Sequence, residues 1–411
     1  MWPGNDVSPR GLAVPSYLTA ILWVLFLTGC GVFLAGVLGP QPLRAWQAYY
    51  INFLYWSGIS FGAVLFTAVL NMTAANWGRP LKRIAEAFGA FLPAGFVLFW
   101  PLWLGSVHLI PWAHQSVGSR ALWLNIPFLF LRNGFSYLVL SVISLALIAF
   151  SLKEECGRTK TTGAAPEDCP DARQSSAWRK QLILSPVLAI VYCFAMSLMG
   201  FDLVMSLDPG WASTLFGGYF FIGSFYTAIA AICLVAFVSR NAEGLRTHLG
   251  PRHFHDLGKL MFAFCLFTGY LFYSQFLVIW YGNIPAETRY VILRVKLTPW
   301  EPIAWVVLTT VFAVPFMFLL SKKIKLKRLP MTLLCIVILV GMWLERFILV
   351  APSLWKQDGV PLGIMELLIT GGYLGLVGLC LTTFLRRFPV LPLSDPLFRQ
   401  SLETDKERLA P

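Results

Sequence analysis

Ten long apolar segments, separated by shorter polar stretches, dominate this sequence of 411 residues. They cover residues 17–38, 51–70, 88–105, 124–150, 182–200, 213–239, 258–280, 302–320, 330–350 and 362–385. Each is close to the ~20 residues that a helix needs to cross the hydrocarbon core of a bilayer. The segments lack the regular polar and apolar alternation that marks the strands of a lipid-facing barrel. The pattern therefore predicts an all-α polytopic membrane protein with about ten transmembrane helices.

The polar stretches divide the chain into five regions. We expect a cytoplasmic N-terminus at 1–16, transmembrane helices 1–4 at 17–150, a cytoplasmic linker at 151–181, transmembrane helices 5–10 at 182–385 and a cytoplasmic C-terminal tail at 386–411. The linker is polar with mixed charges, which is typical of a weakly structured connection. No region outside the membrane is long enough to fold alone, so any catalytic head group has to come from a partner protein.

Composition excludes a water-soluble globule. The chain is 57% hydrophobic and 13% charged, whereas a soluble domain carries roughly 25% charged residues. The eight cysteines show no C-x-x-C spacing, and we interpret them as small buried hydrophobic residues. No histidine lies in the middle of an apolar segment, so the paired axial ligands of a b-type haem bundle are absent. We therefore expect this chain to bind no metal.

The distribution of positive charge predicts the orientation. If both termini lie on one side, that side holds about three quarters of the 32 lysine and arginine residues. Cytoplasmic loops of membrane proteins carry such an excess, so we place both termini in the cytoplasm. The net charge of +12 is thus explained by topology, and binding of nucleic acid is not expected. The basic run at 322–328 is interpreted as a stop signal that contacts lipid headgroups.

Ionisable residues gather toward the non-cytoplasmic surface. They are His108, Arg132, Asp202, Asp208, Glu287, Glu301, Glu345, Arg346 and Glu366. One explanation is that outer loops need polar residues and that the charged pair in the ninth segment is structural. The other is a hydrated chamber that handles protons or quinol, because quinol oxidation needs a base and an exit path for protons. Adjacent residues on a helix point about 100° apart, so we expect Glu345 and Arg346 to contact other helices rather than each other.

Two further groups of polar residues accompany the seventh segment. Lys259, Tyr270, Tyr273, Ser274 and Tyr281 fall on one face at helical spacing and predict either a hydrogen-bonded helix contact or a water-lined proton route. His253 and His255 precede the segment as an H-x-H pair without a clear third ligand, which is weak evidence for a metal site. Helix capping, an interface or proton collection, together with Asp256, explains them better.

Three strings carry a resemblance to a known family. FDLVMSLDPGW at 201–211, followed by STLFG at 213–217, resembles a segment of the F subunit (ActF) of bacterial alternative complex III. HFHDLGKL at 253–260 and IWYGNIPAET at 279–288 resemble two further strings of that family, and Glu345-Arg346 resembles its acidic-arginine pair. Leu203 and Gly210 depart from the family pattern, which often has Trp and His there.

The resemblance implies an NrfD-like membrane subunit in the bacterial cytoplasmic membrane. Its ten helices would form two related, inverted four-helix bundles from spans 2–5 and 6–9, plus two further helices. The complex would oxidise menaquinol or ubiquinol and pass electrons to a periplasmic acceptor. Expected partners are a homologous quinol-binding membrane subunit, an iron-sulfur subunit, multihaem c-type cytochrome subunits and lipids. Haem and iron-sulfur clusters would lie only in those partners, and a quinone such as menaquinone is the one cofactor left for this chain.

Three functions are open at this point. The first is a non-catalytic or proton-translocating subunit that conducts protons and acts as a scaffold. Its candidate path residues are Asp202, Asp208, His253, His255, Asp256, Lys259, Tyr273, Ser274, Glu287, Glu301, Glu345, Arg346 and Glu366. The second is quinol binding by this chain near His108, Arg132 and Asp202. The third is an independent secondary transporter, for which paired broken helices in the middle of the membrane would be the sign.

Overall fold

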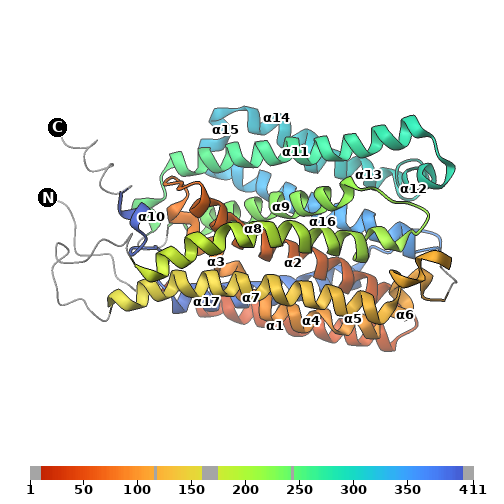
Figure 1. Ribbon diagram of the computed structural model, residues 1–411, viewed down its shortest axis with the longest axis horizontal. Coiled ribbons are helices and arrows are strands. Elements are labelled where there is room, and N and C mark those ends of the chain that lie inside the picture. Colours follow the sequence, from red (N-terminus) through yellow and green to blue (C-terminus); the bar gives the residue numbers. More distant parts are fainter. Residues whose placement is uncertain (1–10, 115–117, 160–174, 242–244, 401–411) are drawn as a thin grey trace.

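A computed structural model describes residues 11–114, 118–159, 175–241 and 245–400, and its fold is all-α (Figure 1). Ten helical spans are long and apolar enough to cross a membrane. They are α1 (Ser16–Leu38), α2 (Pro42–Met72), the broken span Arg79–Leu104, α7 (Ile126–Thr159), α8 (Ser176–Leu203), α9 (Leu215–Ser239), α11 (Pro251–Gly282), the broken span Glu301–Leu320, α16 (Arg328–Leu354) and α17 (Ile364–Arg387). The prediction of about ten transmembrane helices is confirmed.

Short helices lie at the two ends of the bundle. They are α6 (Ser106–Leu109), α10 (Leu245–His248), α12 (Pro285–Val295) and α15 (Lys322–Leu326), with 3-10 turns at Met205–Leu207, Pro111–His114 and Gly118–Leu122. Hydropathy alone does not reveal them, because each is short and most contain charged residues. Of these, α12 is long enough to form three helical turns.

Two of the spans are not continuous α-helices. The third consists of α3 (Lys82–Phe88), α4 (Leu92–Phe99) and α5 (Pro101–Leu104), joined by short irregular turns. The eighth consists of α13 (Glu301–Leu308), a π-helical segment (Thr309–Ala313) and α14 (Val314–Leu320). Pro101 and Pro315 lie at the start of α5 and α14, where the missing N–H and the ring disfavour an unbroken α-helix. By contrast, α8 continues through Pro186.

Several helices extend beyond the apolar segments. α2 begins at Pro42 instead of 51, because Arg44, Gln47 and nearby aromatic residues form its first turns. α7 continues to Thr159 and α8 begins at Ser176, so both ends of the predicted linker 151–181 are helical. The rest of that linker lies outside the described residues. Hydropathy identifies only the apolar part of a helix, whereas the backbone hydrogen bonds that define the helix extend beyond that part.

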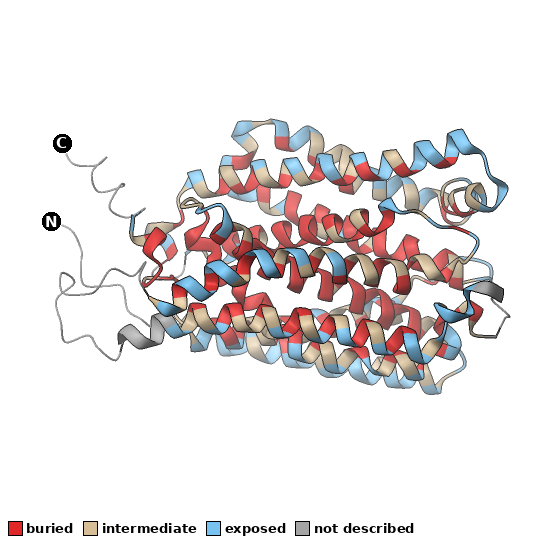
Figure 2. Ribbon diagram, viewed as in Figure 1, coloured by how far each residue is buried: buried red, intermediate tan, exposed pale blue. Residues whose placement is uncertain are grey.

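α2 and α9 form the centre of the molecule and are buried along most of their length (Figure 2). Their backbones approach closely at Gly58 and Gly62 of α2. A Cβ atom on Gly62 would lie 2.8 Å from the Cβ of Ala228 and 3.0 Å from the carbonyl oxygen of Ser224. Small residues four apart are a common device for close helix packing within membranes. This contact therefore explains why α2 and α9 can pack without intervening side chains.

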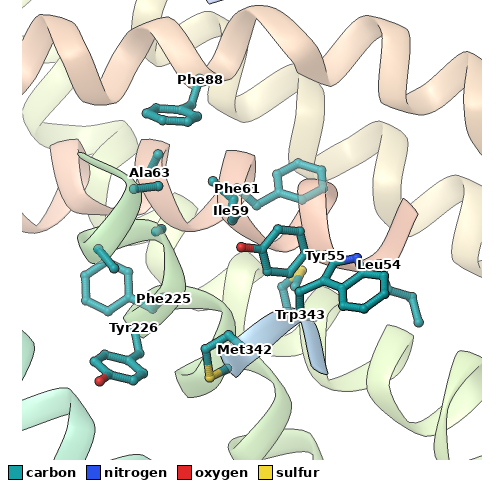
Figure 3. Packing of buried hydrophobic residues seen from close by; sticks show 14 of the residues in the cluster. Leu54, Tyr55, Ile59, Phe61, Ala63, Phe88, Phe225, Tyr226, Met342 and Trp343 are labelled. Carbon is teal, nitrogen blue, oxygen red and sulfur yellow. The ribbon is translucent and has the colours of Figure 1, made fainter. Parts of the chain in front are cut away.

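Aromatic side chains fill the space around this contact. Figure 3 shows Tyr55 of α2, Phe225 and Tyr226 of α9, and Met342 and Trp343 of α16 packed in the core. Buried polar atoms among them find partners on other helices, as membrane interiors require. The Tyr55 hydroxyl donates to the carbonyl of Leu339 at 2.9 Å, and the Trp343 indole donates to Asn52 Oδ1 at 3.1 Å.

The described chain begins and finishes at the same end of the bundle (Figure 1). The backbone N–H of Leu12 donates to Leu385 at 2.7 Å, and Arg386 donates to the carbonyl of Val14 at 2.7 Å. We call this end, which carries Leu12, α10, α15 and residues 388–400, the terminal end. The end that carries α6 and α12 is the opposite end. Having both ends of the chain on one side agrees with an even number of spans.

α2 and α9 pack on each other and each contacts several further spans. α2, the third span, α7 and α8 are neighbours, as are α9, α11, the eighth span and α16. α1 packs on α17, where Gly29 and Gly372 bring the two backbones together. Because α9 also packs on α2 and α8, the division of these spans into two four-helix bundles stays a prediction. That the bundles have related, inverted folds stays a prediction.

Candidate functional site

The charged pair of α16 lies inside the bundle. Glu345 and Arg346 are each 2% exposed, and Arg346 Nη1 lies 3.2 Å from Glu345 Oε2. Glu345 is nine residues before the end of α16, so it lies roughly 14 Å along the helix from the opposite end. The expectation that the two residues would not contact each other is wrong, because their side chains are long enough to bridge the 100° between them.

Arg346 also reaches α9, as the sequence predicts. Its Nη2 donates to Ser224 Oγ at 3.2 Å and to the carbonyl of Phe220 at 3.3 Å, and the guanidinium lies 4.1 Å from the centre of the Phe220 ring. The cation is therefore held by several groups besides Glu345. Its two contacts to the carboxylate, 3.2 and 3.5 Å, are longer than the ~2.7–2.9 Å of a strong charge-assisted hydrogen bond.

Glu345 consequently retains capacity to accept a hydrogen bond. Among the described residues, its Oε2 has no hydrogen bond of good geometry. Tyr219 on α9 lies beside the same carboxylate and interacts with it electrostatically. A carboxylate that is buried in a membrane span, and that is only loosely held by its cation, is suited to exchange a proton with a neighbouring hydroxyl.

A second tyrosine extends this group toward the opposite end. Tyr290 of α12 is buried, stacks on Trp211 with ring centres 3.8 Å apart, and interacts electrostatically with Glu345 and Asp208. Its hydroxyl has no hydrogen-bond partner among the described residues. Burial raises the pKa of Tyr290; Arg294 opposes this change, and Asp208 and Glu345 add to it. Glu345, Tyr219, Tyr290 and Asp208 thus form a group of electrostatically interacting residues, which we call the Glu345 column.

Arg294 fixes α12 against the end of α16. Its Nε donates to the carbonyl of Ile348 at 3.1 Å, and its Nη2 donates to the carbonyl of Leu349 at 3.0 Å and to Ser353 Oγ at 2.7 Å. The guanidinium also covers the Tyr290 ring at 3.5 Å. An arginine near a helix C-terminus satisfies its last carbonyl groups. Arg294 and Tyr290 were not among the sequence candidates, because α12 lies between apolar segments and its position against α16 depends on the fold.

The proposed quinol residues Arg132 and Asp202 do come together. Arg132 donates from Nε to Asp202 Oδ2 at 2.5 Å and from Nη2 to Oδ1 at 2.6 Å. Asn133 Nδ2 and Trp123 Nε1 donate to the same carboxylate at 2.7 and 3.1 Å. These four hydrogen bonds use the carboxylate fully, which makes Asp202 a structural anchor between α7 and α8. His108 is exposed and, among the described residues, makes no hydrogen bond or ion pair with either.

The remaining carboxylates of the opposite half lie in separate places. Glu366 accepts two hydrogen bonds from Arg44, at 2.8 and 2.9 Å, and one from the backbone of Gly363. Glu287 and Glu301 lie in the first turns of α12 and α13, where the helix dipole stabilises a negative charge. The structure therefore divides the predicted chamber into individual ion pairs and helix ends, and only the Glu345 column links several of its members.

Residues at the terminal end form a different group. The Nδ1 of His253 accepts from the backbone N–H of Gly250 at 3.1 Å and caps α11. Asp256 pairs with Lys259 at 2.9 Å and lies 3.7 Å from His255. These residues are separated from the Glu345 column by most of the length of α11 (Figure 1).

The polar stripe of α11 faces outward. Lys259, Tyr270, Tyr273 and Tyr281 are exposed, Tyr281 by 87%, and Ser274 is half-buried. The stripe is therefore neither a hydrogen-bonded contact with another described helix nor a route enclosed within this chain. It is a surface that meets lipid or a partner protein.

A buried ion cluster at the terminal end was not predicted. Asp395 Oδ2 lies 2.8 Å from Lys82 Nζ and 3.1 Å from Arg79 Nη1, and Lys82 also donates to Gln181. Burial alone would raise the pKa of Asp395, but the two cations and the N–H of Leu397 lower it below its ordinary value. More than 300 residues separate the acid from its cations, so no local sequence pattern reveals the cluster.

These features define a polytopic α-helical membrane protein with buried charged groups between its spans. Among the described residues, no group of three or more His, Cys, Asp or Glu side chains is placed to hold a metal ion. Comparison of the sequence with protein-family models gives no match, and comparison with curated proteins gives none either.

Proposed function

We propose that this chain is a membrane subunit of a quinol-oxidising electron-transfer complex, in which it conducts protons and supports iron-sulfur and multihaem partners. The proposal rests on the sequence resemblance for the kind of complex and on the Glu345 column for the role within it. Within that proposal the chain itself carries no redox centre, and a quinone would bind mainly to the homologous membrane subunit.

The proton role rests on the contacts of the Glu345 carboxylate, which differ from those of the other buried carboxylates near the opposite end. Asp202 accepts four hydrogen bonds and Glu366 accepts three, so both carboxylates are fixed as charged anchors. Glu345 is equally buried, but its contacts with its cation are longer, and Tyr219 lies beside it. Proton transfer needs a group that can both hold and release a proton at the same position.

The outward stripe of α11 supports the scaffold role. Tyrosine and tryptophan are enriched where one helix face meets a partner or the membrane interface. Tyr270, Tyr273, Trp280 and Tyr281 are all exposed in the described structure. A second membrane subunit or the membrane-facing part of a partner would cover this face, with Lys259 at its terminal end.

The two alternatives have less support. Quinol binding at Asp202 would require the Arg132 ion pair to open, because the carboxylate has no acceptor capacity left for a quinol hydroxyl. A secondary transporter would place paired broken helices around a central site. The spans Arg79–Leu104 and Glu301–Leu320 are both broken, but the second is largely exposed at the edge of the bundle and packs on α11 and α16 rather than on the first.

Purification in mild detergent of the wild-type chain and of a Glu345→Gln variant tests the proposal. The wild-type chain should co-purify with iron-sulfur and multihaem proteins, and the variant should retain them. Quinol-driven turnover and proton release by the variant complex in liposomes should fall roughly tenfold or more, whereas Glu345→Asp should restore much of both. Glu366→Gln serves as the control for loss of a buried carboxylate outside the column. Normal turnover and proton yield in Glu345→Gln would show that the pair is structural.

A further inference from the structure

A basic groove opens at the terminal end between α11 and α15. It has a volume of about 410 Å³ and is lined by Pro251, Arg252, His255, Asp256, Lys322 and Leu326. Ligand pockets in proteins span roughly 300–1,000 Å³, so the groove is large enough for a small polar group. We call it the α11–α15 groove.

The walls of the groove are held in place by packing. α15 lies on α11 at Gly258, where a Cβ atom would come 3.0 Å from Lys325 Cγ. The stem of Lys325 is buried there, and its ammonium group lies 5.8 Å from the centre of the Phe262 ring. The short helix α15 is therefore seated on the bundle, which positions Lys322 opposite the beginning of α11.

The electrostatics of the groove favour an anion. Within the described residues, Arg252 and Lys322 are exposed and form no ion pair, while the one lining carboxylate, Asp256, is already paired with Lys259. The groove also lies at the N-terminus of α11, a helix of 32 residues whose dipole attracts negative charge. Burial, and to a lesser extent the charge of Lys259, lower the pKa of Lys325 beside the groove.

Apolar side chains continue from the groove toward the membrane. Met317 and Leu320 of α14 are 68% and 60% exposed and lie five and two residues before Lys322. A polar anion site thus stands at the end of an exposed apolar helix face. Lipid is the solvent around such a face, and a free inorganic anion would make no use of it.

We infer that the α11–α15 groove binds the phosphate group of an anionic phospholipid, with Arg252 and Lys322 as its direct ligands and the acyl chains along α14. Arginine and lysine are the side chains that bind phosphate oxygens most strongly. The lipid headgroup would then bridge α11 and α15 at the terminal end. The inference is independent of the proposed redox function, since it uses no residue of the Glu345 column.

Lipid selectivity of the purified chain tests the inference. The protein in phosphatidylcholine nanodiscs is titrated with phosphatidylglycerol of equal chain length, and bound lipid is measured by native mass spectrometry. The wild-type chain should retain phosphatidylglycerol in preference to phosphatidylcholine. The double substitution Arg252→Gln and Lys322→Gln should weaken that binding roughly tenfold or more, since each cation near an anionic lipid contributes several-fold.

The double substitution Lys323→Gln and Lys327→Gln is the matched control. It removes the same charge from exposed residues in and next to α15 that do not line the groove. Equal losses in both double variants would show diffuse attraction and overturn the inference. So would displacement of the lipid by inorganic phosphate at the same concentration, which would indicate a site for free phosphate. If the groove variant does not fold, absence of any preference in the wild-type chain overturns the inference equally.

Discussion

At the scale of single residues, two buried carboxylates of this protein are paired with cations from distant parts of the chain. Asp202 is held by Arg132 on another span, and Asp395 lies between Arg79 and Lys82. Removing one member of such a group leaves the others buried without compensation, which typically costs about 3–5 kcal/mol. Loss of an acid should therefore be more harmful here than at the surface.

Asp395→Asn should lower the free energy of unfolding by about 3–5 kcal/mol at neutral pH, because Arg79 and Lys82 lose their counter-charge. Thermal unfolding in detergent measures the effect. Asp358→Asn, in an exposed loop, is the control and should change the midpoint little.

The effect of Asp395→Asn should also depend on pH. The folded state lowers the pKa of Asp395, so its carboxylate stabilises the fold above the ordinary value of about 4. This stabilisation should be lost as pH falls from about 4 through the lower pKa of the folded state. The difference between wild type and variant should therefore shrink in acid, and a constant difference from pH 7 to pH 3 would contradict the assigned ion cluster.

At the scale of elements, the central contact between α2 and α9 depends on small residues in both helices. Gly58 lies against Ser224, and Gly62 lies against Ala228, so the two helices approach more closely than larger side chains would permit. α9 also carries Tyr219 and Ser224, which contact Glu345 and Arg346. The position of the Glu345 column thus depends on this packing.

Gly62→Leu should destabilise the fold by about 1–3 kcal/mol, because the new side chain has to displace α9. The thermal midpoint in nanodiscs is the measurement. Gly31→Leu on α1 adds the same side chain where nothing lies within 4 Å of the new Cβ, and it should be nearly neutral. If both variants have equal midpoints, α2 and α9 do not pack as described.

The ten spans were predictable because each carries its own signal, a run of apolar residues matched to the thickness of a bilayer. α12 and α15 were not, since their helical form depends on packing against α16 and α11. The same limit applies to the site. The sequence indicates Glu345 and Arg346 as a pair inside the ninth span, but Tyr290 and Arg294 become part of the site only when α12 folds onto the end of α16.

At the scale of the whole molecule, the two ends have different chemistry. The terminal end carries the α11–α15 groove and the Asp395 cluster, with a clear excess of lysine and arginine. The opposite end carries α12, the Arg132–Asp202 pair and the outer members of the Glu345 column. Positive charge on the terminal end is the distribution found on the cytoplasmic side of membrane proteins.

Cysteine labelling of intact cells checks this orientation. In a cysteine-free background, Lys296→Cys at the opposite end should react with a membrane-impermeant maleimide added outside, because the residue is exposed just after α12. Lys323→Cys in α15 should react only after the membrane is permeabilised. The reverse labelling would place the terminal end outside the cytoplasm.

The Asp395 cluster has a consequence for the order in which the protein is made. Arg79 and Lys82 emerge from the ribosome with the third span, more than 300 residues before Asp395. Until residue 395 has been translated, Arg79 and Lys82 lack the carboxylate that pairs with them in the folded chain, although their contacts with Asn71 and Gln181 can already form. Completion of this ion cluster is therefore a step that follows translation of the tenth span, α17.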